Sequence, residues 1–357
     1  MQTTIDQYQA VIRTAAESKT PLQIRGGGTK DFYGNRAGEQ NSALLDMSDY
    51  NGIVDYEPTE LVITARAGTR LADLEAELDQ HGQMLAFEPP YFGAAATLGG
   101  CVAAGLSGPR RVAAGSVRDF VLGVRMLDGK GEDLHFGGQV MKNVAGYDVS
   151  RLMAGSMGTL GVLLEVSLKV LPKPAIETTL CMAMDEAAAI EKMNQWAGKP
   201  LPVSATCYTD GQLFIRLSGA EPAVRAAQVK LSGETLADDK IFWQSVREHT
   251  HGFFQPDKPL WRLSIKSTTP PLLLPGKQLL EWNGALRWLC ATGGDVTEVI
   301  RRAAEEAGGH ATLFRADAAR TAVFHPLPPA LMKIHRTLKE KFDPAGTFNP
   351  GRLYSEI

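Results

Sequence analysis

The sequence has few cysteines, almost no net charge and no long apolar run, and each of these scarcities excludes a class of protein. Its four cysteines lie far apart without a C-x-x-C pair, so we expect no ligand set for an iron–sulfur cluster or a zinc ribbon within the chain. The 37 Lys+Arg and 40 Asp+Glu residues give a formal charge of −3. This balance argues against nucleic-acid binding, which usually leaves a basic footprint.

The longest weakly apolar run, residues 93–106, is shorter than the ~20 residues that cross a bilayer. The first residues contain neither a basic segment nor an apolar one, so we expect no signal peptide. The sequence therefore predicts a cytoplasmic protein with reduced thiols and no membrane span. Any association with the inner face of the cell membrane would be peripheral and would pass through partner proteins.

Glycine is the residue present in excess, with 36 of 357 residues. Residues 91–161 contain 15 of the 36, although the rest of the composition is ordinary, with 44% hydrophobic and 22% charged residues. The length suggests about two domains, each with enough apolar residues for a core.

Hydrophobic periodicity predicts helices and strands along the whole chain. In the first half we expect helices at 5–16, 71–78 and 98–104, and strands at 22–25, 53–56, 61–67, 121–127, 132–136 and 162–171. In the second half we expect strands at 176–182, 203–208, 213–217, 260–265 and 286–289, and helices at 185–196, 222–231, 296–307 and 329–342. The second pattern favours an antiparallel sheet with helices on one face. The fold class is therefore α+β.

A Pro172-Lys173-Pro174 sequence is the expected domain boundary. We expect a first domain over residues 1–174, a second α+β domain over 175–341, and a C-terminal tail over 342–357.

Two loops rich in glycine are candidates for binding a phosphate group. The first, Arg25-Gly26-Gly27-Gly28-Thr29, follows a strand, so its backbone N–H groups would converge on an anion, or the triplet is simply a flexible turn. It is neither a Walker A loop nor a Rossmann fingerprint. The second runs from residue 93 to 105, where Thr97 would begin a helix whose N-terminus favours negative charge. Tight helix packing would explain its small residues, but not consecutive glycines.

A third loop covers residues 115–119, and a fourth covers residues 155–161. Packing alone would explain one such loop. It does not readily explain four glycine-rich loops in a fixed order within one domain. Together they indicate one extended ligand.

These four loops, in this order, resemble the FAD-binding domain of the p-cresol methylhydroxylase/vanillyl-alcohol oxidase superfamily, and most closely the glycolate oxidase FAD-binding subunits. The stretches that carry the resemblance are residues 108–120, 142–148 and 342–352. The similarity covers nearly the whole chain and is strongest over residues 20–174 and the end of the chain. It implies a first domain of the p-cresol methylhydroxylase type and a second domain that caps the cofactor.

The resemblance also implies which residues bind FAD. The first loop and residues 97–100 would hold the pyrophosphate, the third and fourth loops would lie along the adenosine and flavin, and the tail at 349–351 would return to the flavin. The implied contacts are Arg25, Gly26, Gly27, Gly28, Thr29, Pro89, Thr97, Leu98, Gly99, Gly100, Gly105, Gly115, Ser116, Asp119, Gly158, Gly161, Val162 and Asn349.

Two departures from the relatives matter. Many of them attach FAD through a histidine at the end of the first loop, and here that loop has none, so the flavin should be non-covalent. Related catalytic subunits carry an H-x-G-D-G-N-x-H stretch that binds metal and substrate carboxylate, and this sequence has no match to it. His249-Thr250-His251 would place two ligands on one strand face, but no carboxylates support a metal site.

The implied reaction is oxidation of glycolate, or a similar short 2-hydroxy acid, with electrons passing to an acceptor other than a nicotinamide. Arg110 and Arg111 are candidates for the substrate carboxylate, or equally for a phosphate or a partner subunit. A catalytic flavin subunit and an iron–sulfur subunit are the expected partners. A self-sufficient hydroxy-acid dehydrogenase and a non-catalytic FAD-binding or electron-relay subunit remain alternatives. The fold also suits an enolpyruvyl-sugar reductase, for which we find no acid/base set.

Overall fold

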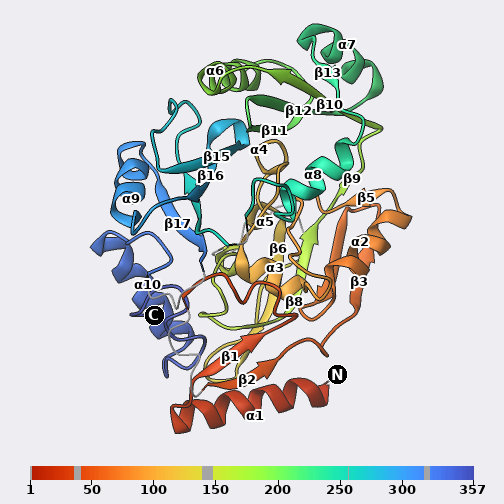
Figure 1. The fold of residues 1–357 in the computed structure, drawn as a ribbon. Coiled ribbons are helices and arrows are strands. Elements are labelled where there is room, and N and C mark those ends of the chain that lie inside the picture. The colour runs from red at the N-terminus through yellow and green to blue at the C-terminus, as the bar shows by residue number, and fades with distance from the viewer. Residues whose placement is uncertain (1, 36–41, 139–147, 256, 317–321) are drawn as a thin grey trace.

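The computed structural model describes residues 2–35, 42–138, 148–255, 257–316 and 322–357. Helices and strands are mixed throughout, which confirms the predicted α+β class. The strands before residue 174 and those after it form separate sheets. Figure 1 shows α1 (Gln2–Ser18) at one end of the molecule and α6 (Glu186–Ala197) and α7 (Glu221–Leu231) at the other.

The first part of the chain builds two small sheets and one larger one. β1 (Leu22–Arg25) pairs in parallel with β2 (Ala43–Asp46), and β5 (Gln83–Met84) pairs with β9 (Leu171–Pro172). The larger sheet has the order β3-β4-β8-β6-β7. Its strands are Ile53–Glu57 (β3), Val62–Arg66 (β4), Val162–Lys169 (β8), Val121–Leu127 (β6) and Asp133–Gly137 (β7).

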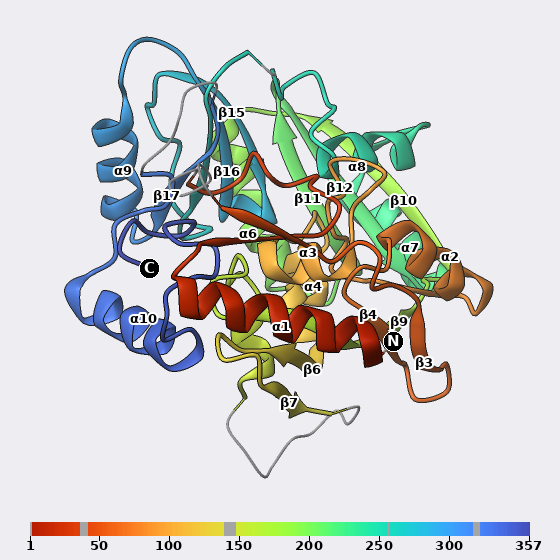
Figure 2. The same cartoon turned by 90° about the horizontal axis from the view of Figure 1, so that it is seen from below.

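Helices cover both faces of this five-stranded sheet, so its central strands β6 and β8 are buried at nearly every position. α2 (Leu71–Gln80) and α3 (Leu98–Ala104) contribute to the core on one face. α1 packs on the other face through residues such as Ile12. Figure 2 shows α1 lying across this end of the molecule. Two short helices, α4 (Arg111–Ala114) and α5 (Val117–Phe120), lead into β6.

The second part forms an eight-stranded sheet with the order β13-β10-β12-β11-β15-β16-β14-β17, in which neighbouring strands are antiparallel. Its strands are β10 (Ile176–Ala183), β11 (Val203–Thr209), β12 (Gln212–Gly219), β13 (Glu234–Thr235), β14 (Leu260–Ser264), β15 (Gly276–Glu281), β16 (Leu286–Ala291) and β17 (His310–Arg315). α6, α7 and α9 (Thr297–Glu306) pack on the outer face.

The sequence pattern predicted helices on only one face of this eight-stranded sheet, but the structure has helices on both faces. α8 (Asp239–Arg247) packs on the inner face of the sheet, where Trp243 and Val246 join a core shared with the first domain. Figure 1 shows α8 between the eight-stranded sheet and α2. The sequence analysis did not predict α8, although Trp243 and Val246 recur at helical spacing on its buried face.

The end of the chain returns to the first domain. α10 (Pro329–Phe342) begins and ends where the sequence predicts, but it packs against the first domain through Leu338 and Phe342, not within the second. Lys339 Nζ donates to the Thr159 carbonyl at 2.9 Å and to the Phe348 carbonyl at 2.7 Å. Two 3₁₀ turns, Ser150–Met153 (η1) and Trp282–Gly284 (η2), complete the elements of the described ranges. No helix in these ranges has the length and apolar character to cross a membrane.

Candidate functional site

The first glycine loop leaves β1 and packs directly against residues 95–97. A Cβ on Gly26 would collide with Thr97 Oγ1, and one on Gly27 would overlap the Ala95 carbonyl oxygen. Gly28 has φ of +69°, a conformation that favours glycine. The triplet is therefore required by close backbone approach and is not merely a flexible turn.

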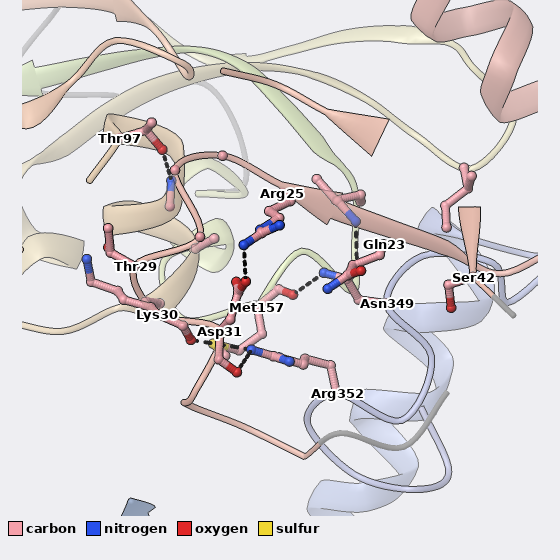
Figure 3. A pocket seen from close by; sticks show the side chains of 18 of the residues that line it. Gln23, Arg25, Thr29, Lys30, Asp31, Ser42, Thr97, Met157, Asn349 and Arg352 are labelled. Carbon is pink, nitrogen blue, oxygen red and sulfur yellow. Dashed lines mark hydrogen bonds and ion pairs between the residues drawn. The ribbon is translucent and has the colours of Figure 1, made fainter. Parts of the chain in front are cut away.

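The loop forms one wall of a cavity, and α3 forms the next. Thr97 caps α3, because its Oγ1 accepts the Gly100 N–H at 3.3 Å, as the sequence predicts. Figure 3 shows Thr97, Thr29, Lys30 and Asn349 around this cavity. The main lining residues are Arg25, Gly26, Gly27, Gly28, Thr29, Lys30, Thr97, Gly100, Ala103, Ala104, Met157, Asn349 and Arg352.

Asn349 ties three segments together at this cavity. Its Oδ1 accepts the Ile24 N–H at 2.8 Å, and its Nδ2 donates to the Met157 carbonyl at 2.7 Å. A Cβ on Gly158 would lie 2.6 Å from the Asn349 amide nitrogen. The tail, the first loop and the fourth loop are thus held in one arrangement, although they are far apart in sequence (Figure 3).

The charges at this cavity are mainly positive. Arg25 pairs with Asp31 at 2.7 Å, and both side chains are partly exposed. Lys30 donates to the Tyr91 carbonyl at 3.3 Å, and burial lowers the pKa of its ammonium group. Arg352 donates to the Asp31 carbonyl at 3.1 Å. A cavity with bare backbone and several cations suits a phosphorylated ligand.

A second cavity adjoins the first, since Ala104 and Met157 line both. It lies between the domains, and its further lining includes Tyr33, Gly105, Ser107, Arg111, Ser116, Arg118, Gly155, Arg262 and Trp282. At its edge Ser116 N and Oγ both donate to Asp119 Oδ2 at 2.8 Å. Although burial alone would raise the pKa of Asp119, these bonds and the nearby Arg111 lower it.

The predicted site residues divide into groups. Eight of them line the first cavity and two, Gly105 and Ser116, line the second. Four others, Leu98, Gly99, Gly161 and Val162, are buried in packing and line neither cavity. A Cβ on Gly99 would lie 2.7 Å from Ala67 Cβ, so helix packing accounts for that glycine.

The remaining predicted contacts lie beside these cavities. Gly115 and Asp119 flank Ser116, and Gly158 adjoins Asn349. Pro89 is buried next to Glu88, and it lines neither cavity. Within the stretch 142–148, residues 142–147 lie outside the described residues.

Arg110 and Arg111 point to different places. Arg110 is 6% exposed and pairs with Glu177 at 2.5 Å and with Glu88 at 3.4 Å. Arg216 of β12 also pairs with Glu88, at 2.8 Å, and although burial would raise the pKa of Glu88, the two guanidinium groups lower it. Arg110 therefore joins the two domains, and of the two residues only Arg111 lines a cavity.

His249 and His251 lie in the turn that follows α8, not on a strand. The ring of His249 is stacked on Phe254 with 4.0 Å between centroids, and burial lowers the pKa of its imidazole well below the usual range. His251 Nδ1 accepts the Phe253 N–H at 3.2 Å. The two side chains thus have separate structural roles.

Sequence reasoning missed several lining residues, including Lys30, Met157, Arg352, Arg262 and Trp282. Lys30 directly follows the first loop, so its position was available as a signal. Arg262 comes from β14 and Trp282 from the 3₁₀ turn η2 of the second domain, and no local pattern brings them together.

The fold and the glycine-lined cavity define a FAD-binding protein of the p-cresol methylhydroxylase type. A family model described as "FAD binding domain" matches residues 2–137. Alkyldihydroxyacetonephosphate synthase has the same fold, with a TM-score of 0.64 and 15% identity over 96% of this chain and 73% of that one. This lining fits FAD, because its glycines lie where a side chain would clash with neighbouring residues and because it carries several cations.

The chain belongs to the family of glycolate oxidase subunit GlcE. It is 50% identical to GlcE of Escherichia coli (strain K12) over 97% of this chain and 96% of that protein. It is 28% identical to glycolate oxidase subunit GlcD of Bacillus subtilis (strain 168) over 56% of this chain and 42% of that protein. It is 31% identical to D-lactate dehydrogenase of Anaerostipes hadrus over 48% and 36%, respectively.

Proposed function

We propose that this chain is the FAD-binding subunit of a glycolate oxidase complex, which oxidises glycolate or a similar short 2-hydroxy acid to the 2-oxo acid. The electrons would pass to an acceptor other than a nicotinamide. The observation that carries the proposal is the 50% identity to E. coli GlcE, which extends over 97% of this chain and 96% of that protein. Similarity to GlcD and D-lactate dehydrogenase, which covers about half of this chain, supports the same substrate class.

The residues of the first cavity would hold the cofactor. The bare backbone of Gly26, Gly27 and Gly28 provides close approach for a pyrophosphate, and Lys30 and Arg25 provide positive charge. When bound, FAD supplies the two-electron redox chemistry. The absence of histidine from the first loop supports non-covalent binding.

We further propose that the chain acts with partners. A flavin subunit similar to GlcD and an iron–sulfur subunit are the partners that the family relationship suggests, because GlcE and GlcD are both described as glycolate oxidase subunits. Arg111, rather than Arg110, is the residue of the predicted pair that remains a candidate for contact with the substrate.

The test is dye reduction by the purified chain with glycolate, measured alone and together with the two partner subunits. We expect turnover only in the reconstituted complex. Turnover by the chain alone would show a self-sufficient dehydrogenase. If the complex turns over equally well with a chain that cannot retain FAD, a non-catalytic assembly role replaces our proposal.

A further inference from the structure

The cavity between the domains has an unusual lining. Three arginines face it, namely Arg111 and Arg118 from the first domain and Arg262 from the second. Among the described residues that line it there is no aspartate or glutamate. Such an imbalance attracts an anion, because low-dielectric walls strengthen the field of the guanidinium groups.

Arg262 faces the first domain because of its register in β14. Its neighbours Trp261 and Leu263 point to the outer face, where they pack beneath α9. The guanidinium group of Arg262 makes no hydrogen bond or ion pair with any residue in the described ranges. Its guanidinium carbon lies 5.2 Å from the centroid of the Trp282 ring, and that of Arg111 lies 4.5 Å from the same ring.

Trp282 is held firmly in this position. Its indole N–H donates to the Gly108 carbonyl at 3.1 Å, in a buried contact between the two domains. Trp282 and Asn283 both have positive φ, of 55° and 58°. Asn283 N–H donates to Thr206 Oγ1 at 2.9 Å, which helps to hold this strained turn. One fixed aromatic ring therefore brings together arginines from both domains.

The carboxylates of Asp119 and Glu281 act electrostatically on Arg111 and Arg262, respectively, but their hydrogen bonds go to other groups. Asp119 accepts the hydrogen bonds of Ser116, and Glu281 accepts the Trp288 indole N–H at 2.8 Å. Burial lowers the pKa of Arg262, and the charge of Arg111 lowers it further. A half-buried cation without an ion-pair partner is unfavourable, and a bound anion would relieve that cost.

We propose that Arg262 and Arg111, organised by Trp282, bind the carboxylate of a small organic acid in the cavity between the domains. The proposal rests on the proposed function, because that acid would be the 2-hydroxy acid substrate or its 2-oxo product. The planar guanidinium group matches a carboxylate through two parallel hydrogen bonds. A phosphate of the cofactor is the other anion that these arginines would suit.

The experiment measures oxalate binding to the FAD-loaded full chain by isothermal titration calorimetry. Oxalate carries the carboxylate groups but has no hydroxyl group to be oxidised. Oxamide, which is similar in shape but uncharged, is the control for the probe. The variants are Arg262→Gln, Arg262→Lys and Arg111→Gln. Arg302→Gln is the matched control, because it removes the same charge from an exposed position on α9. FAD content is measured for every variant from the ratio of flavin to protein absorbance.

We expect oxalate to bind and oxamide not to bind. Arg262→Gln and Arg111→Gln should each raise the Kd for oxalate about tenfold or more, with FAD content unchanged. Arg262→Lys should retain part of the affinity. Wild-type affinity for oxalate in both Gln variants, or no oxalate binding to the wild-type chain, would overturn the proposal. Loss of FAD from Arg262→Gln would overturn it too, by assigning the arginine to the cofactor phosphates.

Glycolate-dependent dye reduction by the complex, run in parallel, separates this proposal from the proposed function. Arginine-dependent oxalate binding without turnover would refute the proposed function and support the carboxylate site. Turnover without oxalate binding would do the reverse. Since Arg111 lies on the short surface helix α4, its variant keeps the test valid even if Arg262→Gln fails to fold.

Discussion

The two adjoining cavities of this protein are built by different means. The first is lined mostly by backbone and small side chains from one domain, together with Asn349 and Arg352 of the returning tail. The second combines small residues with three arginines and three aromatic side chains, and it requires both domains. They meet at Ala104 and Met157, so a ligand in one cavity adjoins a ligand in the other.

This difference separates two kinds of recognition. Bare backbone accommodates an extended cofactor by shape, and it cannot change without steric conflict. Arginines on opposite domains recognise charge, and their spacing depends on how the domains are joined.

Gly27→Ala should abolish retention of FAD, because the new Cβ would overlap the Ala95 carbonyl and displace the loop. The measurement is the flavin-to-protein absorbance ratio after gel filtration. Gly252→Ala is the control, since nothing lies within 4 Å of an added Cβ there and Gly252 is not among the glycines with positive φ. Full FAD occupancy in Gly27→Ala would show that this loop does not form the cofactor site.

Arg110→Gln should lower the free energy of unfolding by about 3 kcal/mol, because it removes a buried cation that the half-buried Glu88 and the more exposed Glu177 share. The measurement is urea unfolding followed by tryptophan fluorescence. Arg225→Gln removes an exposed pair with Glu221, so its effect should stay below about 1 kcal/mol. Equal effects of the two variants would mean that the Arg110 pairs do not join the domains.

Glu281 should make stability depend on pH. Burial raises the pKa of this carboxyl from 4.5 to about 7, against the opposing effect of the Trp288 hydrogen bond. Because the folded state then binds the proton more tightly than the unfolded state, the free energy of unfolding should fall by roughly 3 kcal/mol as pH rises through this window.

Glu281→Gln keeps an oxygen for the Trp288 N–H and should remove most of this slope, as measured by urea unfolding at several pH values. Glu306→Gln, at an exposed position on α9, should leave the slope unchanged. An unchanged slope in Glu281→Gln would show that this carboxyl titrates alike in the folded and unfolded states.

Asn349→Ala should lower the free energy of unfolding by about 2 kcal/mol, because it removes the hydrogen bonds to Ile24 N–H and the Met157 carbonyl. FAD affinity should fall as well, since these bonds hold two walls of the first cavity together. Asn51→Ala, at an exposed site with one hydrogen bond to the Ser48 carbonyl, should have little effect on either quantity. Parallel behaviour of the two variants in unfolding and FAD titration would argue against this role of the tail.

Local patterns predicted the parts of the fold that local chemistry determines. The hairpins of β3–β4 and β6–β7, the Thr97 cap and the bounds of α10 all follow from apolar spacing and turn residues. β15 was missed because Gly276-Lys277-Gln278 begins it with polar, poorly strand-forming residues. The sequence of α10 does not specify which domain the helix contacts, and only the structure shows Leu338 and Phe342 packed against the first domain.

The same limit applies to the two cavities. The glycine loops could be predicted from the sequence, because consecutive glycines directly indicate a backbone without side chains. The arginine cavity could not, because Arg262 is brought to Arg111 by strand register and by contacts between the domains. Arg110 and Arg111 show the converse, since they are adjacent in sequence but have different roles. Arg110 pairs with Glu177, whereas Arg111 lines the second cavity.

The measurement that tests the central claim most directly is the flavin content of the purified chain before and after acid precipitation. The account predicts about one FAD per chain, all released into the supernatant, since one extended site holds the cofactor and the first loop has no histidine. A chain that purifies and refolds with excess FAD yet binds none would contradict the cofactor site. Yellow colour retained in the pellet would contradict non-covalent binding.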